Sequence, residues 1–308
     1  MRVAAIDCGT NSLRLLVADV DPAAGTIRDL VREMEIVRLG EGVDKTHRFS
    51  DAALGRTLAT CREYARRIDA LHAEQTRFVA TSASRDATNR DEFFDGVRAA
   101  LGVDVEVVSG EEEAALSFAG ATQELVGKKD VPPPYLVVDI GGGSTEFVLG
   151  SSGVDAARSV DVGCVRLAER HLRSDPATTA EIEAATLDVE RALDLVEEAV
   201  PLKAAATLVG LAGSVTTVAA LALGLPQYDP QRIHHSRIAA SSVHEITERL
   251  LAMSCAERKA LAVMHPGRAD VIGAGALVLD TIVRRVDAAE VVVSEHDILD
   301  GIALSIAH

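Results

Sequence analysis

One short pattern occurs twice in this chain, and it constrains the fold more than any other feature of the sequence. The first copy is AAIDCGTNSLRLLV, residues 4–17, and the second is LVVDIGGGSTEFVL, residues 136–149. In each copy an apolar run reaches an Asp, continues through a Gly two positions later and a Ser five positions later, and turns apolar again. Such runs around a small polar loop predict two strands joined by a tight turn. The chain is therefore expected to duplicate a strand–loop–strand unit at a distance of about 130 residues.

The length and the remaining pattern predict two α/β domains. A chain of 308 residues is too long for one ordinary core, and strand-like and helix-like segments alternate along it. The segment KKDVPPP, 128–134, is the best linker candidate, because three consecutive prolines stop a helix. We therefore expect domains over 1–127 and 128–308, with the last helix able to pack back on the first domain.

Charge and composition exclude several classes of function. The formal net charge of −16 and the 3% of aromatic residues argue against generic binding to nucleic acid or to anionic membranes. Residues 204–228 carry no charge, but their Gly and Ser/Thr content favours a buried strand, turn and helix over a membrane span. The four scattered cysteines form no CxxC pair, and no signal peptide precedes the first strand. These features predict a cytoplasmic protein with reduced thiols.

Several helices can be placed from caps and periodicity. Ser50 is expected to cap a helix that runs to about His72, and Asn89 with Glu92 has the spacing of a capping box. Further helices are predicted over 179–199, 242–263 and 268–286, and the chain is expected to close with a strand and a helix.

The two loops predict phosphate binding. Small residues in tight turns expose backbone N–H groups that bind anions, and hydroxyl and amide side chains add donors. The candidate ligand-binding residues of the loops are Thr10, Asn11, Ser12, Gly141, Gly142, Gly143, Ser144 and Thr145. Asp7 and Asp139 end the first strand of each copy, where a carboxylate is expected to hold hydrated Mg²⁺ that bridges to phosphate. Neither a Walker-type loop nor a dinucleotide fingerprint fits, because GxxxxGK[ST] is absent and strands rather than helices follow the glycines.

The two copies differ in charge at one equivalent position. Arg14 and Glu146 each lie seven residues after the Asp of their copy, and two residues after its Ser. Strand alternation therefore directs a cation toward the ligand in one copy and a carboxylate in the other. We predict that Arg14 clamps phosphate and that Glu146 binds metal or water.

Other candidates are weaker. Gly213 and Ser214, in VGLAGSVTT, offer either a helix N-terminus to a second phosphate or only tight packing. The pair His234 and His235 suggests a metal site, but partner ligands are missing at useful spacing, so a role in a loop or helix start is favoured. Asp297 and Asp300 are expected to cap or brace the final helix.

The combined motifs resemble the exopolyphosphatase and guanosine pentaphosphate phosphatase family. The resemblance rests on DCGTNSLRLLV, DIGGGSTEFVL and SGEEEA, followed in order by VGLAGSVTT, HPGRADVI and SEHDILDGI, and it covers essentially the whole chain. It implies two ribonuclease-H-like domains of the actin/Hsp70/sugar-kinase fold with a central cleft. Longer family members carry an extra helical C-terminal region that this chain lacks, which puts a long polymer channel in doubt.

The resemblance also implies an activity and site residues. The activity is Mg²⁺-dependent removal of terminal phosphate from polyphosphate, with Mn²⁺ as an alternative metal. Glu113 is implied as the catalytic carboxylate, Arg85 as a phosphate-binding residue, and Asp139 and Glu146 as metal-site acids. On sequence alone, Glu111–Glu113 are acids at a helix start, and Arg85 is a cation in a loop after a strand.

Three alternatives stay open at this point. Guanosine pentaphosphate or tetraphosphate is a rival substrate or ligand, because it would use the same phosphate site. A small-molecule kinase of the same fold is disfavoured, since no acceptor motif is evident. A sensor without catalysis is disfavoured by the intact Glu113, Asp139 and Glu146. A homodimer is compatible with the fold, although no sequence feature establishes it.

Overall fold

The computed structural model describes residues 1–21 and 25–307. Contacts divide the chain into two compact units, and each is described by itself. Unit 1 comprises Met1–Gln123 and Ile298–His308, and unit 2 comprises Glu124–Asp297. The sequence-based division at 127/128 left the last helix with the second domain, whereas the contacts assign that helix to unit 1.

Unit 1 contains a five-stranded sheet in the described part of the chain, with the order β3-β2-β1-β4-β5. The first three strands are antiparallel, and β1, β4 and β5 are parallel. The strands are β1 (Arg2–Cys8), β2 (Ser12–Asp21), β3 (Thr26–Ile36), β4 (Gln75–Ala80) and β5 (Val105–Val107). The helices of this unit are α1 (Val43–Thr46), α2 (Asp51–Leu71), α3 (Ser82–Asp86), α4 (Arg90–Leu101), α5 (Gly110–Thr122) and α13 (Ile298–Ile306).

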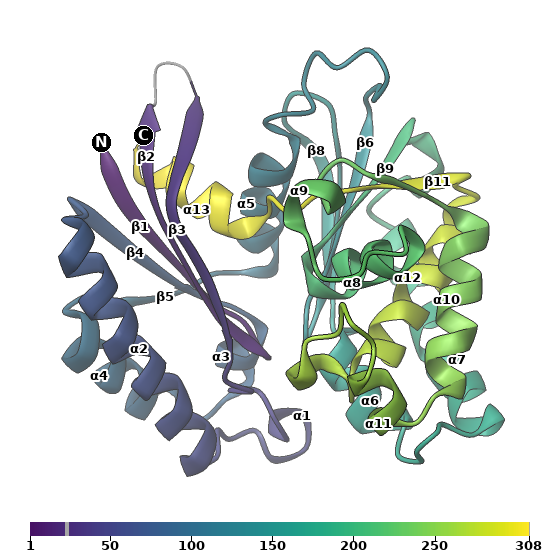
Figure 1. Cartoon of the computed structure of the whole chain (residues 1–308), viewed down its shortest axis with the longest axis horizontal. Helices are drawn as coiled ribbons and strands as arrows, with labels where there is room; N and C mark the ends of the chain where they lie inside the picture. Colours follow the sequence, from purple (N-terminus) through teal and green to yellow (C-terminus); the bar gives the residue numbers. More distant parts are fainter. Residues whose placement is uncertain (22–24, 308) are drawn as a thin grey trace. The chain divides into compact units, whose positions relative to one another are not determined.

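Helices cover both faces of this sheet, as Figure 1 shows for α2 and α4 on one side and α13 and α5 on the other. Strand alternation divides the buried residues between two cores. Ala4 and Ile6 pack with α2 and α4 in one core, while Val3 and Ala5 pack with α13 in the other. The continuous apolar character of β1 in the sequence follows from this burial on both faces.

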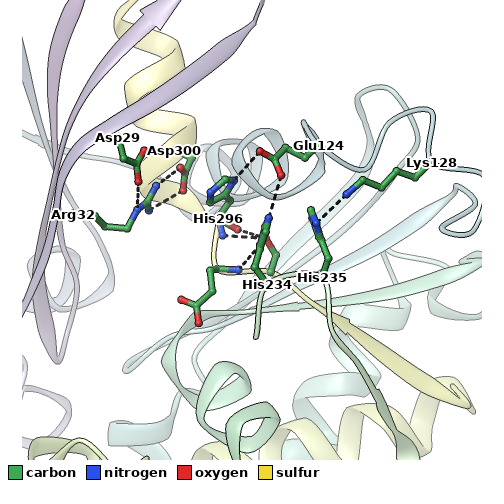
Figure 2. A network of polar contacts seen from close by, with 10 residues as sticks. Asp29, Arg32, Glu124, Lys128, His234, His235, His296 and Asp300 are labelled. Atoms are coloured by element: carbon green, nitrogen blue, oxygen red, sulfur yellow. Dashed lines mark hydrogen bonds and ion pairs between the residues drawn. The ribbon is translucent and has the colours of Figure 1, made fainter. Parts of the chain in front are cut away.

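Helix α13 is fixed in unit 1 by a close backbone approach and an ion pair. A Cβ atom at Gly301 would lie 2.0 Å from the carbonyl oxygen of Leu116 in α5, so only glycine allows this packing. Asp300, which is 1% exposed, receives two hydrogen bonds from Arg32 of β3 at 2.5 and 3.2 Å. Figure 2 shows this pair together with Asp29, which also bonds Arg32. Asp300 thus braces the final helix, as expected, and the sequence did not reveal its partner.

Unit 2 repeats the strand order of unit 1 and adds an edge strand. Its order is β10-β11-β9-β6-β7-β8, in which β8-β7-β6 are antiparallel and β6, β9 and β11 are parallel. The strands are β6 (Tyr135–Ile140), β7 (Thr145–Gly150), β8 (Val154–Val160), β9 (Thr207–Leu211), β10 (Arg237–Ala239) and β11 (Glu290–Val293). The repeated order confirms the internal duplication and the predicted fold class of two α/β domains.

The helices of unit 2 share one large core around the long helix α12, which contacts α6, α7, α8 and α10. The helices are α6 (Cys164–His171), α7 (Thr179–Glu197), α8 (Ala212–Ala222), α9 (Pro230–Ile233), α10 (Ala240–Ala252), α11 (Cys255–Lys259) and α12 (Ile272–Val286). Two short 3₁₀ helices, Leu202–Ala204 and Pro266–Arg268, complete the unit. The uncharged stretch 204–228 forms β9 and α8, as predicted, and no described helix is long and apolar enough to cross a bilayer.

Three local predictions were wrong. Asn89 makes no capping hydrogen bond to its helix, because its side chain instead bonds both backbone groups of Phe49. The predicted helix over 242–263 is broken after Ala252, because Ser254 begins the separate helix α11 with a capping box to Glu257. Arg85 lies in the short helix α3 and not in a loop.

Candidate active site

The two predicted loops have the same backbone closure, one in each unit. In unit 1 the N–H of Gly9 donates to the carbonyl of Ser12 at 3.0 Å, and in unit 2 the N–H of Gly141 donates to the carbonyl of Ser144 at 3.0 Å. Each bond closes the turn between an antiparallel strand pair, β1–β2 or β6–β7. The sequence echo is therefore a repeated three-dimensional turn.

A second segment holds the carbonyl groups of each loop. In unit 1 the N–H groups of Val37 and Arg38 donate to the carbonyl of Asn11, and that of Gly40 donates to Thr10. In unit 2 the first N–H groups of α6 donate to the carbonyls of Gly141 and Gly142. These bonds hold the backbone of each loop in place, so that loop N–H groups outside the turn closure can face an anion.

The unit 2 loop forms an anion cradle. Within the described residues, the N–H groups of Gly142, Gly143 and Ser144 have no protein acceptor. Arg166 of α6 donates from Nε to the carbonyl of Gly143 at 2.7 Å, which fixes the loop from behind. Gly163 allows this contact, since a Cβ there would lie 2.5 Å from the Gly142 backbone. Three consecutive free donors in a rigid turn form a nest of the kind that binds phosphate.

The threonine after this nest has another role for its hydroxyl. Thr145 is fully buried, and its hydroxyl donates to the carbonyl of Val162. The contact fastens β7 to the segment that leads into α6.

The acidic residues of the two copies face different neighbours. In unit 1, Asp7 lies directly opposite Arg14 in the strand register, and Arg14 donates to Oδ2 of Asp7 from Nε at 2.9 Å and from Nη2 at 2.7 Å. In unit 2, Asp139 lies directly opposite Glu146, and Glu146 accepts a hydrogen bond from Ser159 at 2.7 Å. Directly opposite residues project from the same face of a sheet.

This difference separates the two copies chemically. In unit 1 the carboxylate of Asp7 is paired with Arg14, and in unit 2 the strand register places the buried carboxylates of Asp139 and Glu146 side by side. Paired carboxylate oxygens are the donors that Mg²⁺ prefers, so the residues of unit 2 fit a magnesium ion. The sequence predicted Asp7 and Arg14 as separate ligands of metal and phosphate, and it missed their pairing.

Glu113 is held at the start of α5 by a guanidinium group. The helix begins at Gly110 behind the cap Ser109, whose hydroxyl accepts the N–H of Glu112 at 3.1 Å. Arg85 donates from Nη1 to Glu113 at 2.8 Å and to the carbonyl of Val108 at 3.0 Å. Glu113 is 8% exposed. The carboxylate is therefore held in one orientation and largely shielded from bulk water, as suits a general base.

The neighbouring acid of the same helix has a different environment. Glu112 is exposed and pairs with Arg77 at 3.0 Å, and Arg77 also pairs with Glu106. Glu112 is therefore a helix-start acid, as the sequence analysis described it, and it forms a surface ion pair.

The third Gly-Ser turn lies at the start of α8, where an arginine covers it. A Cβ atom at Gly213 would lie 2.2 Å from Cζ of Arg268, so the guanidinium lies directly against this glycine. Ser214 is buried against Gly275 of α12, which indicates a packing role for its side chain. The sequence analysis quoted HPGRADVI but did not single out Arg268, because nothing in the sequence places it beside Gly213.

Comparisons with known proteins agree with this geometry. The profile of the Ppx/GppA phosphatase family matches residues 16–308. Exopolyphosphatase 2 of Mycobacterium tuberculosis is 51% identical over 317 residues, which cover 99% of this chain and 98% of the relative.

Solved structures extend the agreement to three dimensions. The crystal structure of an exopolyphosphatase-like protein has a TM-score of 0.95 and 43% identity, covering 99% of this chain and 98% of the other. A Ppx-GppA enzyme of Aquifex aeolicus has a TM-score of 0.81 and 30% identity, covering 99% of both chains. With a family match over nearly its whole length, this chain belongs to the Ppx/GppA phosphatase family.

Proposed function

We propose that this chain is an exopolyphosphatase that hydrolyses terminal phosphate from inorganic polyphosphate, with a preference for short chains. The observation that carries the proposal is the unit 2 loop, where a nest of three backbone donors follows a strand with the buried acids Asp139 and Glu146 nearby. This arrangement suits a phosphate bound together with a divalent cation. The 51% identity to Exopolyphosphatase 2 supports the same substrate class.

Each unit supplies distinct groups to the proposed reaction. In unit 2, the N–H groups of Gly142, Gly143 and Ser144 bind phosphate oxygens, and Asp139 and Glu146 hold Mg²⁺ or Mn²⁺. Arg268, which lies against Gly213 at the start of α8, offers a second anion site. When bound, the metal supplies positive charge that stabilises the transferred phosphoryl group. In unit 1, Thr10, Asn11 and Ser12 donate hydrogen bonds to phosphate. Arg14 clamps phosphate while it is paired with Asp7.

Glu113 performs the proton chemistry in this proposal. Its carboxylate accepts a hydrogen bond from the attacking water and orients the water toward the terminal phosphorus. It takes a proton from the water as the new P–O bond forms and the bridging P–O bond to the penultimate phosphate breaks, so that the shortened chain leaves with the bridging oxygen. Arg85 fixes the carboxylate through the 2.8 Å bond. Phosphoryl transfer depends mainly on positioning and charge neutralisation, so a held carboxylate and a rigid nest are sufficient protein groups.

The test is phosphate release in the presence of Mg²⁺ by wild type, Glu113→Gln and Glu112→Gln. The substrates are short-chain polyphosphate, long-chain polyphosphate and guanosine pentaphosphate. Glu112→Gln is the matched control, since it makes the same change one residue earlier at an exposed ion pair. We expect Glu113→Gln to lose about 10²–10⁴ in kcat while still binding polyphosphate, and Glu112→Gln to retain activity.

The outcomes distinguish the rival functions. Faster cleavage of guanosine pentaphosphate than of either polyphosphate would make the alarmone the main substrate of the same site. If wild type binds all three compounds tightly but releases no phosphate from them, the chain is a sensor and not an enzyme. Equal activity of Glu113→Gln and wild type would remove Glu113 from the mechanism.

A further inference from the structure

A cluster of ligand-type side chains in unit 2 lies outside the phosphate-binding groups. Glu124, His234 and His296 each offer one ligand atom, and these atoms lie within 4.8 Å of one another. Nε2 of His234 lies 3.1 Å from a Glu124 oxygen, and Nδ1 of His296 lies 3.8 Å from the other oxygen. Figure 2 shows both imidazole rings directed at the Glu124 carboxylate.

Three separate segments bring these residues together. Glu124 follows α5 and is the first residue of unit 2, His234 ends α9, and His296 follows β11. The two rings pack against each other with centroids 4.5 Å apart. The sequence offered no partner ligands at useful spacing near RIHHSRI, because the residues that meet His234 come from distant parts of the chain.

The distances suit a small tetrahedral ion. Zinc bonds of 2.0–2.2 Å to nitrogen and oxygen place two ligand atoms roughly 3.4 Å apart. The separations of 3.1 and 3.8 Å, each to a different oxygen of Glu124, lie on either side of this value, so small movements of the rings and a rotation of the carboxylate complete the geometry. Two imidazoles and one carboxylate are a ligand set used for zinc and other divalent transition metals.

The charge states of the groups also suit a cation. Burial lowers the pKa of His234, so its ring is neutral near pH 7. Burial opposes ionisation of Glu124, but the hydrogen bond from His234 and the nearby imidazoles lower its pKa overall. The cluster therefore offers a carboxylate and the neutral imidazole of His234 to a cation.

We propose that Glu124, His234 and His296 form a binding site for a divalent transition metal of the zinc class. The ligands are Nε2 of His234, Nδ1 of His296 and an oxygen of Glu124, with water in the remaining position. The bound ion would join Glu124, the first residue of unit 2, to His296 near the end of the same unit. This proposal does not depend on the proposed phosphatase activity.

Metal binding changes the hydrogen bonding of His234 in a defined way. Without metal, the N–H of Glu295 donates to Nδ1 at 3.1 Å, so the ring proton is on Nε2 and faces Glu124. Coordination uses the lone pair of Nε2, so the Nε2 proton passes to solvent and Nδ1 takes one up. The bond from Glu295 is given up, and His234 changes tautomer.

The adjacent histidine is not a ligand. His235 stacks on His234 with centroids 3.6 Å apart, and its Nδ1 accepts from Lys128 at 2.9 Å. The ring thus supports His234 from its other side.

The test uses the full chain stripped by chelator and titrated with Co²⁺ followed by Zn²⁺. We expect one equivalent of Co²⁺ with the visible absorption of a four-coordinate nitrogen and oxygen site, and its displacement by Zn²⁺. His296→Gln and Glu124→Gln should each weaken binding at least about tenfold. His171→Gln is the matched control, because His171 pairs with Asp188 at 2.9 Å in a two-residue His–carboxylate contact and should leave binding unchanged.

Ring-nitrogen NMR of wild type gives an independent readout if the variants do not fold. The expected result is a change of His234 from the Nε2–H to the Nδ1–H tautomer when one equivalent of Zn²⁺ is added. Four results would each overturn the proposal. They are a six-coordinate Co²⁺ spectrum, a thiolate charge-transfer band that assigns the ion to the half-buried Cys255, an unchanged His234 tautomer, and wild-type metal affinity in both ligand variants.

Discussion

The packing of α13 against α5 gives a sharp prediction for Gly301→Ala. The new Cβ would lie 2.0 Å from the carbonyl oxygen and 2.7 Å from the carbonyl carbon of Leu116. Both are backbone atoms, so relief requires movement of one helix. Overpacking of this kind costs about 1–3 kcal/mol, against a gain of roughly 1 kcal/mol from replacing Gly by Ala in a helix. Since backbone atoms cannot turn aside, we expect a net loss of about 2 kcal/mol.

Gly55→Ala is the matched control. Gly55 is an exposed residue in the interior of α2, and a Cβ there would meet nothing within 4 Å. The same substitution should therefore stabilise the chain by about 0.5–1 kcal/mol through helix propensity and chain entropy. In urea unfolding, we expect a lower midpoint for Gly301→Ala and a higher midpoint for Gly55→Ala. The slope of the unfolding free energy against urea concentration should be unchanged in both.

Gly301→Ala should also lower the catalytic rate. Leu116 lies on α5 three residues after Glu113, so displacement of this helix moves Glu113 relative to Arg85. A shift of about 1 Å can lower kcat by roughly 10²-fold, whereas Gly55→Ala should leave kcat unchanged. A Gly301→Ala variant as stable and as active as wild type would refute the packing argument.

Three more predictions concern other parts of the chain. Asp300→Asn leaves Arg32 without its buried partner and should destabilise the chain by about 2–3 kcal/mol in urea unfolding, while a change below about 1 kcal/mol would contradict this. Burial lowers the pKa of His235 from 6.5 to about 4, so the unfolded chain binds the proton more readily and stability falls as pH drops through this window. The wild-type chain should therefore lose unfolding free energy between pH 7 and pH 4.5, and His235→Asn should reduce this loss by about 1–2 kcal/mol once the shift is discounted for the partial exposure of the ring. The same loss in wild type and variant would contradict this prediction. Glu146→Gln should raise the Mg²⁺ concentration for half-maximal phosphate release at least about tenfold, and an identical Mg²⁺ titration would exclude Glu146 from the metal site.

The sequence determined the local parts of the molecule. The repeated Asp, Gly and Ser spacing predicted two equivalent turns, because turn geometry depends on a few adjacent residues whose backbone freedom and hydrogen bonds are local. Ser50 predicted the start of α2 for the same reason, and its hydroxyl does accept the N–H of Ala53. The fold class followed from the alternation of strands and helices and from the internal repeat.

Only the tertiary structure decided which side chains meet. The pairing of Asp7 with Arg14, of Asp139 with Glu146 and of Arg85 with Glu113 depends on strand register and on helix placement. Asn89 failed as a cap because Phe49, forty residues away, offered its side chain two better-placed backbone partners.

The histidine cluster shows the same limit most clearly. His234 met Glu124 and His296 only after chain folding brought three segments to one place, and no spacing rule within the sequence connects them. Local hydrogen bonding and hydrophobic periodicity are encoded over a few residues, whereas long-range charge pairs and ligand sets arise from packing, in which every element is positioned by all the others.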